Sequence, residues 1–449
     1  MQERNTNLTI DNLSSSALAC RRKVAWRLLP FLFAAYIVAY LDRANVSFAN
    51  VYMSADLHFS PAVYGFGAGV FFLGYFLLEI PGALIVERWS ARLWISRILV
   101  TWGLCTAIVA FVHTGVQFFS ARFLLGCAEA GFFPGVMVYL THWFTERDRA
   151  RAAAAFVIAA PVSLAIGAPL SAAILHAPWP ALAPWRWLFI IQGLPAVILG
   201  VFAVRRLTDH PRTADWLTGD EKRWLIEELG QESASREPGQ PPAWWRSLLT
   251  RNVLLLAAAH FMANVAGYSF IFWLPANLRE ATRLSPVLAD MAPALPFSAA
   301  VVALWLAARS SDKTGERKAH ACIPMLAAAL GIMLAALPNL PGGLVLGVIT
   351  LTGGAVFAWI PGFWVLPTLS LSRDAAAASI GFINAVGNLG GFLGPFVTGV
   401  LRSQGYTRMA SAMVIAIAYA GAATLTWLVA APRRVEQSQA PASRTPGNL

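Results

Sequence analysis

Two charged turns recur half a chain apart in this sequence: Glu87-Arg88-Trp89-Ser90-Ala91-Arg92 and Asp312-Lys313-Thr314-Gly315-Glu316-Arg317. Each contains an acidic residue, a base, a tight turn and a second base, and the copies lie about 225 residues apart in a chain of 449. A repeat at half the chain length indicates a duplication. Turns with both signs of charge can pair with neighbouring helix ends, so we expect a gate between two movable halves. The predicted gate residues are Glu87, Arg88, Arg92, Asp312, Gly315 and Arg317.

Long apolar segments surround these turns and indicate that a lipid bilayer is the solvent. Hydrophobic residues make up 57% of the sequence and charged residues 13%, whereas soluble domains have about 25% charged residues. Several segments run for about 20 residues with almost no charge, the length of a membrane-spanning helix. They are continuously apolar and lack the alternation of a barrel strand, so we predict an all-α membrane protein. The twelve predicted spans are 27–51, 62–86, 93–112, 117–142, 152–176, 185–204, 250–276, 288–308, 320–337, 343–371, 376–401 and 409–431.

The positive charges indicate how these spans are oriented. With the N-terminus in the cytoplasm, about 26 of the 34 Lys and Arg residues fall in the tails and cytoplasmic connections. This bias predicts a multi-pass protein of the cell's inner (plasma) membrane, with both termini in the cytoplasm. The net charge of +11 is scattered over short loops instead of forming one face, so we expect no nucleic-acid partner.

The one long polar stretch divides six spans from six. It contains a short amphipathic segment, Asp215 to Leu229, and then a proline- and glycine-containing part typical of a flexible linker. The predicted divisions are a cytoplasmic tail (1–25), an N-terminal six-helix bundle (26–204), a cytoplasmic linker (205–249), a C-terminal six-helix bundle (250–431) and a cytoplasmic tail (432–449).

Three further motifs make a family resemblance specific. They are Tyr40-Leu41-Asp42-Arg43-Ala44-Asn45, RFLLGCAEAGFFP (122–134) and NAVGNLGGFLGP (384–395). With the paired gate turns, they resemble the anion:cation symporter branch of the major facilitator superfamily over about residues 25 to 431. The resemblance implies two pseudo-symmetric six-helix bundles and transport of a solute such as tartrate, a sugar acid, phthalate or hydroxyphenylacetate. Ser90 departs from the family pattern, which usually has Gly in the first gate turn.

Four ionisable residues lie inside predicted spans, where an unpaired charge is costly and functional roles are common. Asp42 and Arg43 sit past the middle of the first span, and Glu129 lies in the middle of the fourth. Arg122 precedes Glu129 by two helical turns, so both point to one face of that helix. Arginine suits the binding of an anion, and a carboxylate suits the exchange of a proton. The alternative is that the four residues form structural ion pairs between the first and fourth spans.

The resemblance implies matching roles for these residues. Asp42 and Glu129 correspond to proton-titrating carboxylates of the family, and Arg43 and Arg122 to its substrate-binding or gating arginines. The resemblance also implies substrate contacts for Tyr40, Tyr75, and Asn384 or Asn388. Simple packing remains an alternative for Tyr75, and helix-to-helix hydrogen bonding for one asparagine.

Other polar residues and glycines in the spans are explained by gating, by contact with the membrane surface or by helix packing. Glu79 with Pro81, and Arg97, are expected at the inner gate, with snorkelling to the membrane surface as the alternative. Glycines inside the spans indicate close helix packing and not a nucleotide-binding loop. The histidines show no ligand spacing. We therefore expect no catalytic residues, no metal and no cofactor.

Together these features predict a secondary active transporter, not an enzyme. The leading hypothesis is proton-coupled uptake of a small mono- or dicarboxylate by alternating access, driven by the proton gradient, in a protein for which a monomer would suffice. The alternative is a proton-antiport exporter of drugs or metabolites, for which Pro161, Gly167 and Pro169 in the fifth span resemble the exporter pattern. A membrane-embedded enzyme or sensor is disfavoured because no nucleophile–base pair accompanies the duplicated gate.

Overall fold

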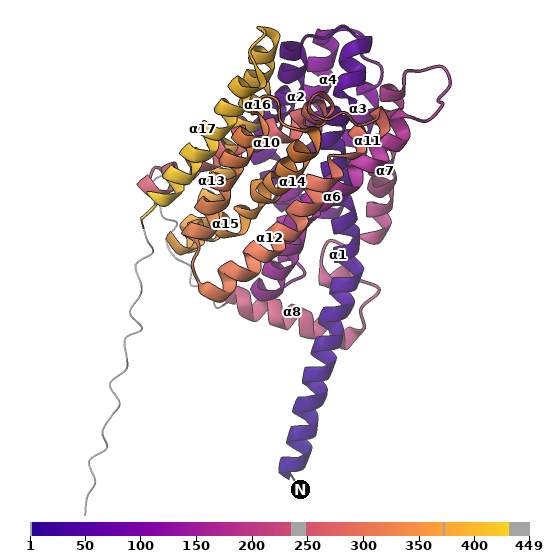
Figure 1. Ribbon diagram of the computed structural model, residues 1–449. Coiled ribbons are helices and arrows are strands. Elements are labelled where there is room, and N and C mark those ends of the chain that lie inside the picture. The colour runs from indigo at the N-terminus through magenta and orange to yellow at the C-terminus, as the bar shows by residue number, and fades with distance from the viewer. Residues whose placement is uncertain (1, 235–247, 371–372, 431–449) are drawn as a thin grey trace, which may run out of the picture.

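The computed structural model describes residues 2–234, 248–370 and 373–430 and is helical throughout its regular elements (Figure 1). Within these residues, 12 helical segments are long and apolar enough to cross a membrane. The first runs over Ala17–Asp56 and the last over Arg408–Trp427. The predicted all-α fold with twelve spans is therefore confirmed. Residues 235–247 of the predicted linker and the predicted C-terminal tail (432–449) lie outside the described residues.

The N-terminal half is built from seven helices that form six spans, because the fourth span is broken. The break lies at Ala130, which leaves the helical conformation (ψ 136°), and at Gly131, whose φ of 84° suits a residue without a side chain. The helices are α1 (Gln2–Asp56), α2 (Pro61–Arg88), α3 (Ala91–Val109), α4 (Gly115–Glu129), α5 (Phe132–Thr141), α6 (Glu146–Leu175) and α7 (Pro184–Arg206).

The C-terminal half repeats this arrangement, with its second and fourth spans each divided into two helices. It lies beside the N-terminal half, as the indigo-to-magenta and orange-to-yellow ribbons show in Figure 1. Its helices are α10 (Arg251–Ala281), α11 (Pro286–Met291), α12 (Ala294–Thr314), α13 (Lys318–Ala335), α14 (Gly342–Ala358), α15 (Ile360–Ser370), α16 (Arg373–Ser403) and α17 (Arg408–Trp427).

The described part of the connection between the halves contains a short 3-10 turn, η1 (Pro211–Thr213), and the helix α8 (Gly219–Ala234). The α8 helix covers most of the predicted amphipathic segment and crosses the N-terminal part of α1 (Figure 1). Arg21 of α1 donates to Glu228 (2.8 Å), and Lys23 donates to Glu221 (2.7 Å). We call this end of the molecule the α8 end. Because α1 is helical from Gln2, it extends through the predicted N-terminal tail.

The halves pack against each other at the end opposite α8, where α2 begins. The Tyr64 hydroxyl of α2 donates to the backbone carbonyl of Phe272 in α10 (3.0 Å). The Phe66 ring lies 5.6 Å from the rings of both Phe392 and Phe396 of α16. Edge-to-face aromatic contacts of this kind favour close helix packing without a charge. The polar residues of interest lie deeper, between this seam and the α8 end.

Candidate functional site

A buried ion pair joins α1 to α4 inside the N-terminal half. Arg43 donates to Glu129 through its Nη2 atom, and their side chains are 12% and 2% exposed. Glu129 is the last residue of α4, immediately before the break at Ala130. Two charges at this depth are tolerated because each compensates the other. The four-residue prediction placed these two residues in separate spans, and the structure brings them into contact.

Aromatic rings also contact the Arg43 guanidinium. Its Cζ atom lies 5.0 Å from the Tyr40 ring, 5.3 Å from the Phe71 ring and 5.3 Å from the Tyr75 ring. Cation–π attraction is strongest where water is excluded, so these rings hold the guanidinium in place. Tyr40 and Tyr75, which the sequence suggested as substrate contacts, therefore contact the arginine that would bind the anion.

Arg43 also reaches the other half of the molecule. Its Nη1 atom donates to the Tyr268 hydroxyl of α10 at 3.3 Å. Sequence reasoning missed Tyr268, but a signal was present. Arg43 and Tyr268 are 225 residues apart, the same offset as the two gate turns, so they occupy equivalent places in the first and seventh spans. The ion pair is thus positioned at the contact between the halves.

Asp42 points to a different partner from its neighbour Arg43. Its Oδ2 atom accepts a hydrogen bond from the Trp102 indole of α3, and the residue is fully buried. Its Oδ1 atom has no hydrogen-bond partner among the described residues. Successive residues on a helix diverge by about 100°, which explains why Asp42 faces α3 while Arg43 faces α4. Trp102 was not predicted.

Arg122 and Arg43 both contact the ring of Phe71. The Arg122 guanidinium is 5.1 Å from the centre of this ring, and its Nη2 atom donates to the Ala68 carbonyl at 3.4 Å. Arg122 is fully buried, and its Nε and Nη1 atoms have no hydrogen-bond partner among the described residues. Arg122 and Glu129 do not form an ion pair in this structure. A buried guanidinium with free donors is suited to accept an anion.

Asn384 and Asn388 of α16 approach the site from the C-terminal half. Their amide groups donate to the two oxygens of Glu79 in α2, at 2.6 Å and 3.2 Å. Glu79 lies one helical turn beyond Tyr75, so this contact continues the polar layer around Arg43. The sequence suggested the asparagines as substrate contacts and Glu79 as part of an inner gate. The structure shows them bound to one another across the halves.

The two gate turns differ in structure. Gly315 adopts a φ of 70° at the end of α12, and Arg317 pairs with Asp312 at 2.7 Å. Ser90 has a φ of −69° and caps α3, so the first turn requires no glycine. The backbone of Arg92 donates to Asp209, at 2.9 Å, just after α7. These contacts join the first turn to the segment that follows α7 and the second turn to itself. The side chains of Glu87 and Arg88 lie outside the described ones.

A second polar cluster joins the halves at the end opposite α8, centred on the buried Asp290 of α11. Tyr52 of α1 donates to its Oδ2 atom, and the imidazole of His176, which follows α6, lies 3.0 Å from the same oxygen. Arg279 of α10 lies 3.8 Å from Oδ1 and 4.9 Å from the centre of the Tyr52 ring. We call these four residues the Asp290 cluster. It was not predicted, because the sequence offers only an acidic residue at the start of a span.

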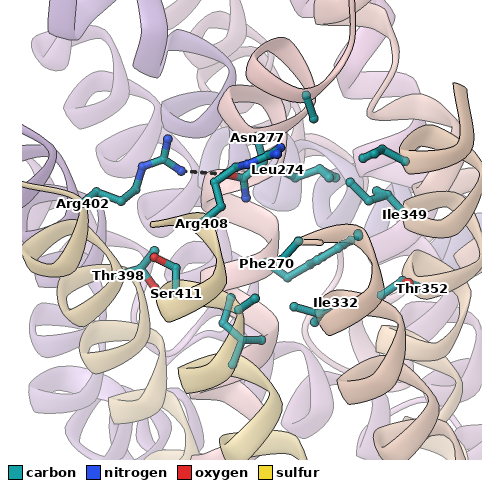
Figure 2. Close-up of a pocket in the computed structure, with 16 residues that line it drawn as sticks. Phe270, Leu274, Asn277, Ile332, Ile349, Thr352, Thr398, Arg402, Arg408 and Ser411 are labelled. Carbon is teal, nitrogen blue, oxygen red and sulfur yellow. Dashed lines mark hydrogen bonds between the residues drawn. The ribbon is translucent and has the colours of Figure 1, made fainter. Parts of the chain in front are cut away.

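A cavity of about 70 Å³ lies elsewhere, within the C-terminal half. Figure 2 shows Arg402 and Arg408 directed toward Asn277 at one side of it, with Thr398 and Ser411 beside each other below. Its lining comes from α10, α13, α14, α16 and α17. Neither Arg43 nor Glu129 nor any residue of the Asp290 cluster lines it, so this cavity is separate from the polar contacts between the halves.

Comparison with known proteins identifies the fold. The family model described as Major Facilitator Superfamily matches residues 32–395. The chain belongs to this superfamily. Within it, the chain is 42% identical over 382 residues to the "Putative tartrate transporter" of Agrobacterium vitis, covering 85% of this chain and 88% of that protein. It is 35% identical over 419 residues to the "Quinolone resistance transporter" of Acinetobacter baumannii, covering 93% and 96%.

Solved structures agree on the superfamily fold. The xylose transporter XylE from E. coli, in an inward open conformation, superimposes with a TM-score of 0.73 at 13% identity, over 92% of this chain and 97% of that one. Members of this superfamily with these folds are transporters and not enzymes. The resemblance drawn from the sequence motifs is therefore confirmed, and the tartrate relative is consistent with an organic-anion branch.

Proposed function

We propose that this superfamily member is a proton-coupled symporter that takes up a small organic anion, a mono- or dicarboxylate, by alternating access. The observation that carries the proposal is the buried Arg43–Glu129 pair, which also touches Tyr268 of the opposite half. An anion that binds Arg43 would compete with Glu129 for the guanidinium. Substrate binding, a titratable carboxyl group and the contact between the halves thereby meet in one place.

The chemistry around Arg43 favours an anion. A guanidinium keeps its charge and can bind both oxygens of a carboxylate, and the rings of Tyr40, Phe71 and Tyr75 fix its orientation. Arg122 offers further free donors behind Phe71. The tartrate relative supports the same class of solute. Tartrate, sugar acids and aromatic acids are the candidates.

Two buried carboxyl groups can carry the proton. Glu129 loses its counter-charge when an anion takes Arg43, and binding a proton then removes the uncompensated charge. Asp42 has one hydrogen bond, from Trp102, and one oxygen without a partner among the described residues. Neither step changes a bond within the substrate. The proton gradient would drive the cycle without a cofactor.

Alternating access requires the halves to separate at one end at a time. The Asp290 cluster and the Tyr64–Phe272 contact close the end opposite α8. The bias of Lys and Arg residues toward the tails, the linker and the even-numbered connections supports a cytoplasmic location for the α8 end. We place the protein in the inner membrane, acting as a monomer.

An uptake experiment tests the substrate class. Purified protein in liposomes with an acidic exterior is presented with radiolabelled tartrate, and unlabelled sugar acids, aromatic acids and dicarboxylates compete. We expect concentrative uptake of at least one carboxylate and its loss in Arg43→Ala, while Arg309→Ala, a change at the surface of α12, transports normally. Absence of uptake for the whole panel would exclude carboxylate symport.

A proton-antiport exporter is the second candidate, supported by the quinolone-resistance relative. Both Pro161 and Pro169 lie inside α6, where exporters often carry a proline- and glycine-rich pattern. The two functions differ in direction. In inverted vesicles with an acidic interior, an exporter accumulates a fluoroquinolone, whereas the proposed symporter does not.

A further inference from the structure

Glu79 is a carboxylate that the protein holds in the polar layer between its halves. Its side chain is only 7% exposed, and it lies in the membrane-spanning part of α2. Asn384 and Asn388 each donate one hydrogen bond to it, one to each oxygen. Two amides spaced four residues apart on one helix face form a fork that fits the two oxygens of a carboxylate. The fork thus binds an anion that belongs to the protein itself.

The contacts of Glu79 are unusual for a buried charge. Both hydrogen bonds come from neutral amides, and no ion pair joins Glu79 to a base among the described residues. Glu129, by contrast, is paired with Arg43. A buried carboxylate with only neutral donors is more weakly compensated than one with a guanidinium. A competing anion should therefore displace Glu79 from the two asparagine amides more easily than it would displace Glu129 from Arg43.

Glu79 lies close in α2 to the residues around Arg43, where the anion is proposed to bind. Arg43 lies over the Tyr75 ring, and Tyr75 precedes Glu79 by one turn of α2. The opposite half brings two sets of hydrogen-bonding groups to this layer, the Tyr268 hydroxyl at Arg43 and the Asn384–Asn388 amide fork of α16. In the structure this fork is already occupied by Glu79.

We propose that Glu79 is a tethered stand-in for the substrate carboxylate. It occupies the Asn384–Asn388 fork in the empty transporter and gives the fork up when the anion binds. This inference rests on the proposed function, because it requires an organic anion at Arg43. The displaced carboxylate loses two hydrogen bonds beside a second anion, and a proton taken up from bulk solvent then neutralises it. Binding of the anion is thus accompanied by the uptake of one proton at Glu79.

Calorimetric titration of the purified protein with L-tartrate and with succinate tests this exchange. Titrations in buffers of different ionisation enthalpy count the protons taken up on binding. In the wild type the anion must displace Glu79, at a net cost of about one hydrogen bond to a charged group, and Glu79→Ala removes this cost. We therefore expect the variant to bind the anion about tenfold more tightly and to take up one proton fewer per anion. Glu79→Gln, which keeps the shape, should also lose that proton. Glu280→Gln, at a surface pair with Arg402, is the matched control.

The possible outcomes separate this inference from the proposed function. Unchanged or weaker binding with an unchanged proton count in Glu79→Ala and Glu79→Gln would show that Glu79 is a structural bridge, and would overturn the inference alone. If the Ala variant does not fold, the proton count of the Gln variant decides. Asn384→Ala should weaken binding with or without Glu79→Ala. Binding of neither probe by folded wild-type protein would refute carboxylate transport and this inference with it.

Discussion

Replacing the Arg43–Glu129 pair by neutral residues should separate its structural from its transport role. Glu129→Gln leaves a buried guanidinium that cannot lose its charge, so breaking the pair costs about 3–5 kcal/mol. Arg43→Gln leaves a carboxyl group that can become neutral by binding a proton. This variant should therefore lose less stability than Glu129→Gln, toward about 3 kcal/mol. The double variant leaves two neutral amides and recovers most of the stability. Since the side chains are 12% and 2% exposed, water cannot compensate either single change.

The assay compares unfolding temperature with transport in the same preparations. We expect the order wild type, double variant, Arg43→Gln and Glu129→Gln for decreasing unfolding temperature, and no proton-driven uptake in any of the three variants. Glu280→Gln provides the control, because its pair with Arg402 is half-exposed on the glutamate side and such pairs contribute about 1 kcal/mol or less. Wild-type uptake by the double variant would show that the pair is purely structural and would refute its role in coupling.

Three further predictions concern other parts of the protein. Asp290→Asn should weaken the contact between the halves opposite α8 and raise labelling of a reporter cysteine there by an impermeant maleimide. Trp102→Phe removes the indole hydrogen bond to Asp42 and should change the pH dependence of uptake more than the affinity for the anion. Burial, with the nearby His210 ring, lowers the pKa of His142. The unfolded protein therefore binds more protons below about pH 6.5, and acid should lower the unfolding temperature less in His142→Gln.

Each of these predictions has a result that contradicts it. Labelling that is unchanged in Asp290→Asn would show that the cluster does not hold that end closed. A parallel loss of affinity at every pH in Trp102→Phe would indicate a packing role. An identical shift in unfolding temperature between pH 7.5 and 5.5 in His142→Gln and wild type would exclude His142 as the responsible group.

The spans were predictable because their signal is local. A helix in lipid needs about 20 apolar residues wherever it lies in the fold, so sequence alone located all twelve. The charges of Asp42, Arg43, Arg122 and Glu129 stood out for the same reason. Breaks within spans were less visible, although Gly131 marks the one beside Glu129.

The partners of these residues depend on how helices are arranged in three dimensions. Nothing near Glu79 in the sequence indicates two asparagines about 300 residues away. Asp290 lies at the start of a predicted span, and nothing near it in the sequence indicates its partners Tyr52, His176 and Arg279. Tyr268 is an intermediate case, since the repeat offset from Arg43 could have identified it.

Proton movement during substrate entry tests the central claim most directly. Liposomes containing the protein and a pH-sensitive dye are held at equal pH inside and outside, and a carboxylate that the uptake screen identifies is added with a label. The account predicts internal acidification in step with entry of the label, and its loss in Asp42→Asn and Glu129→Gln. Entry of the label with no acidification in the wild type would contradict it.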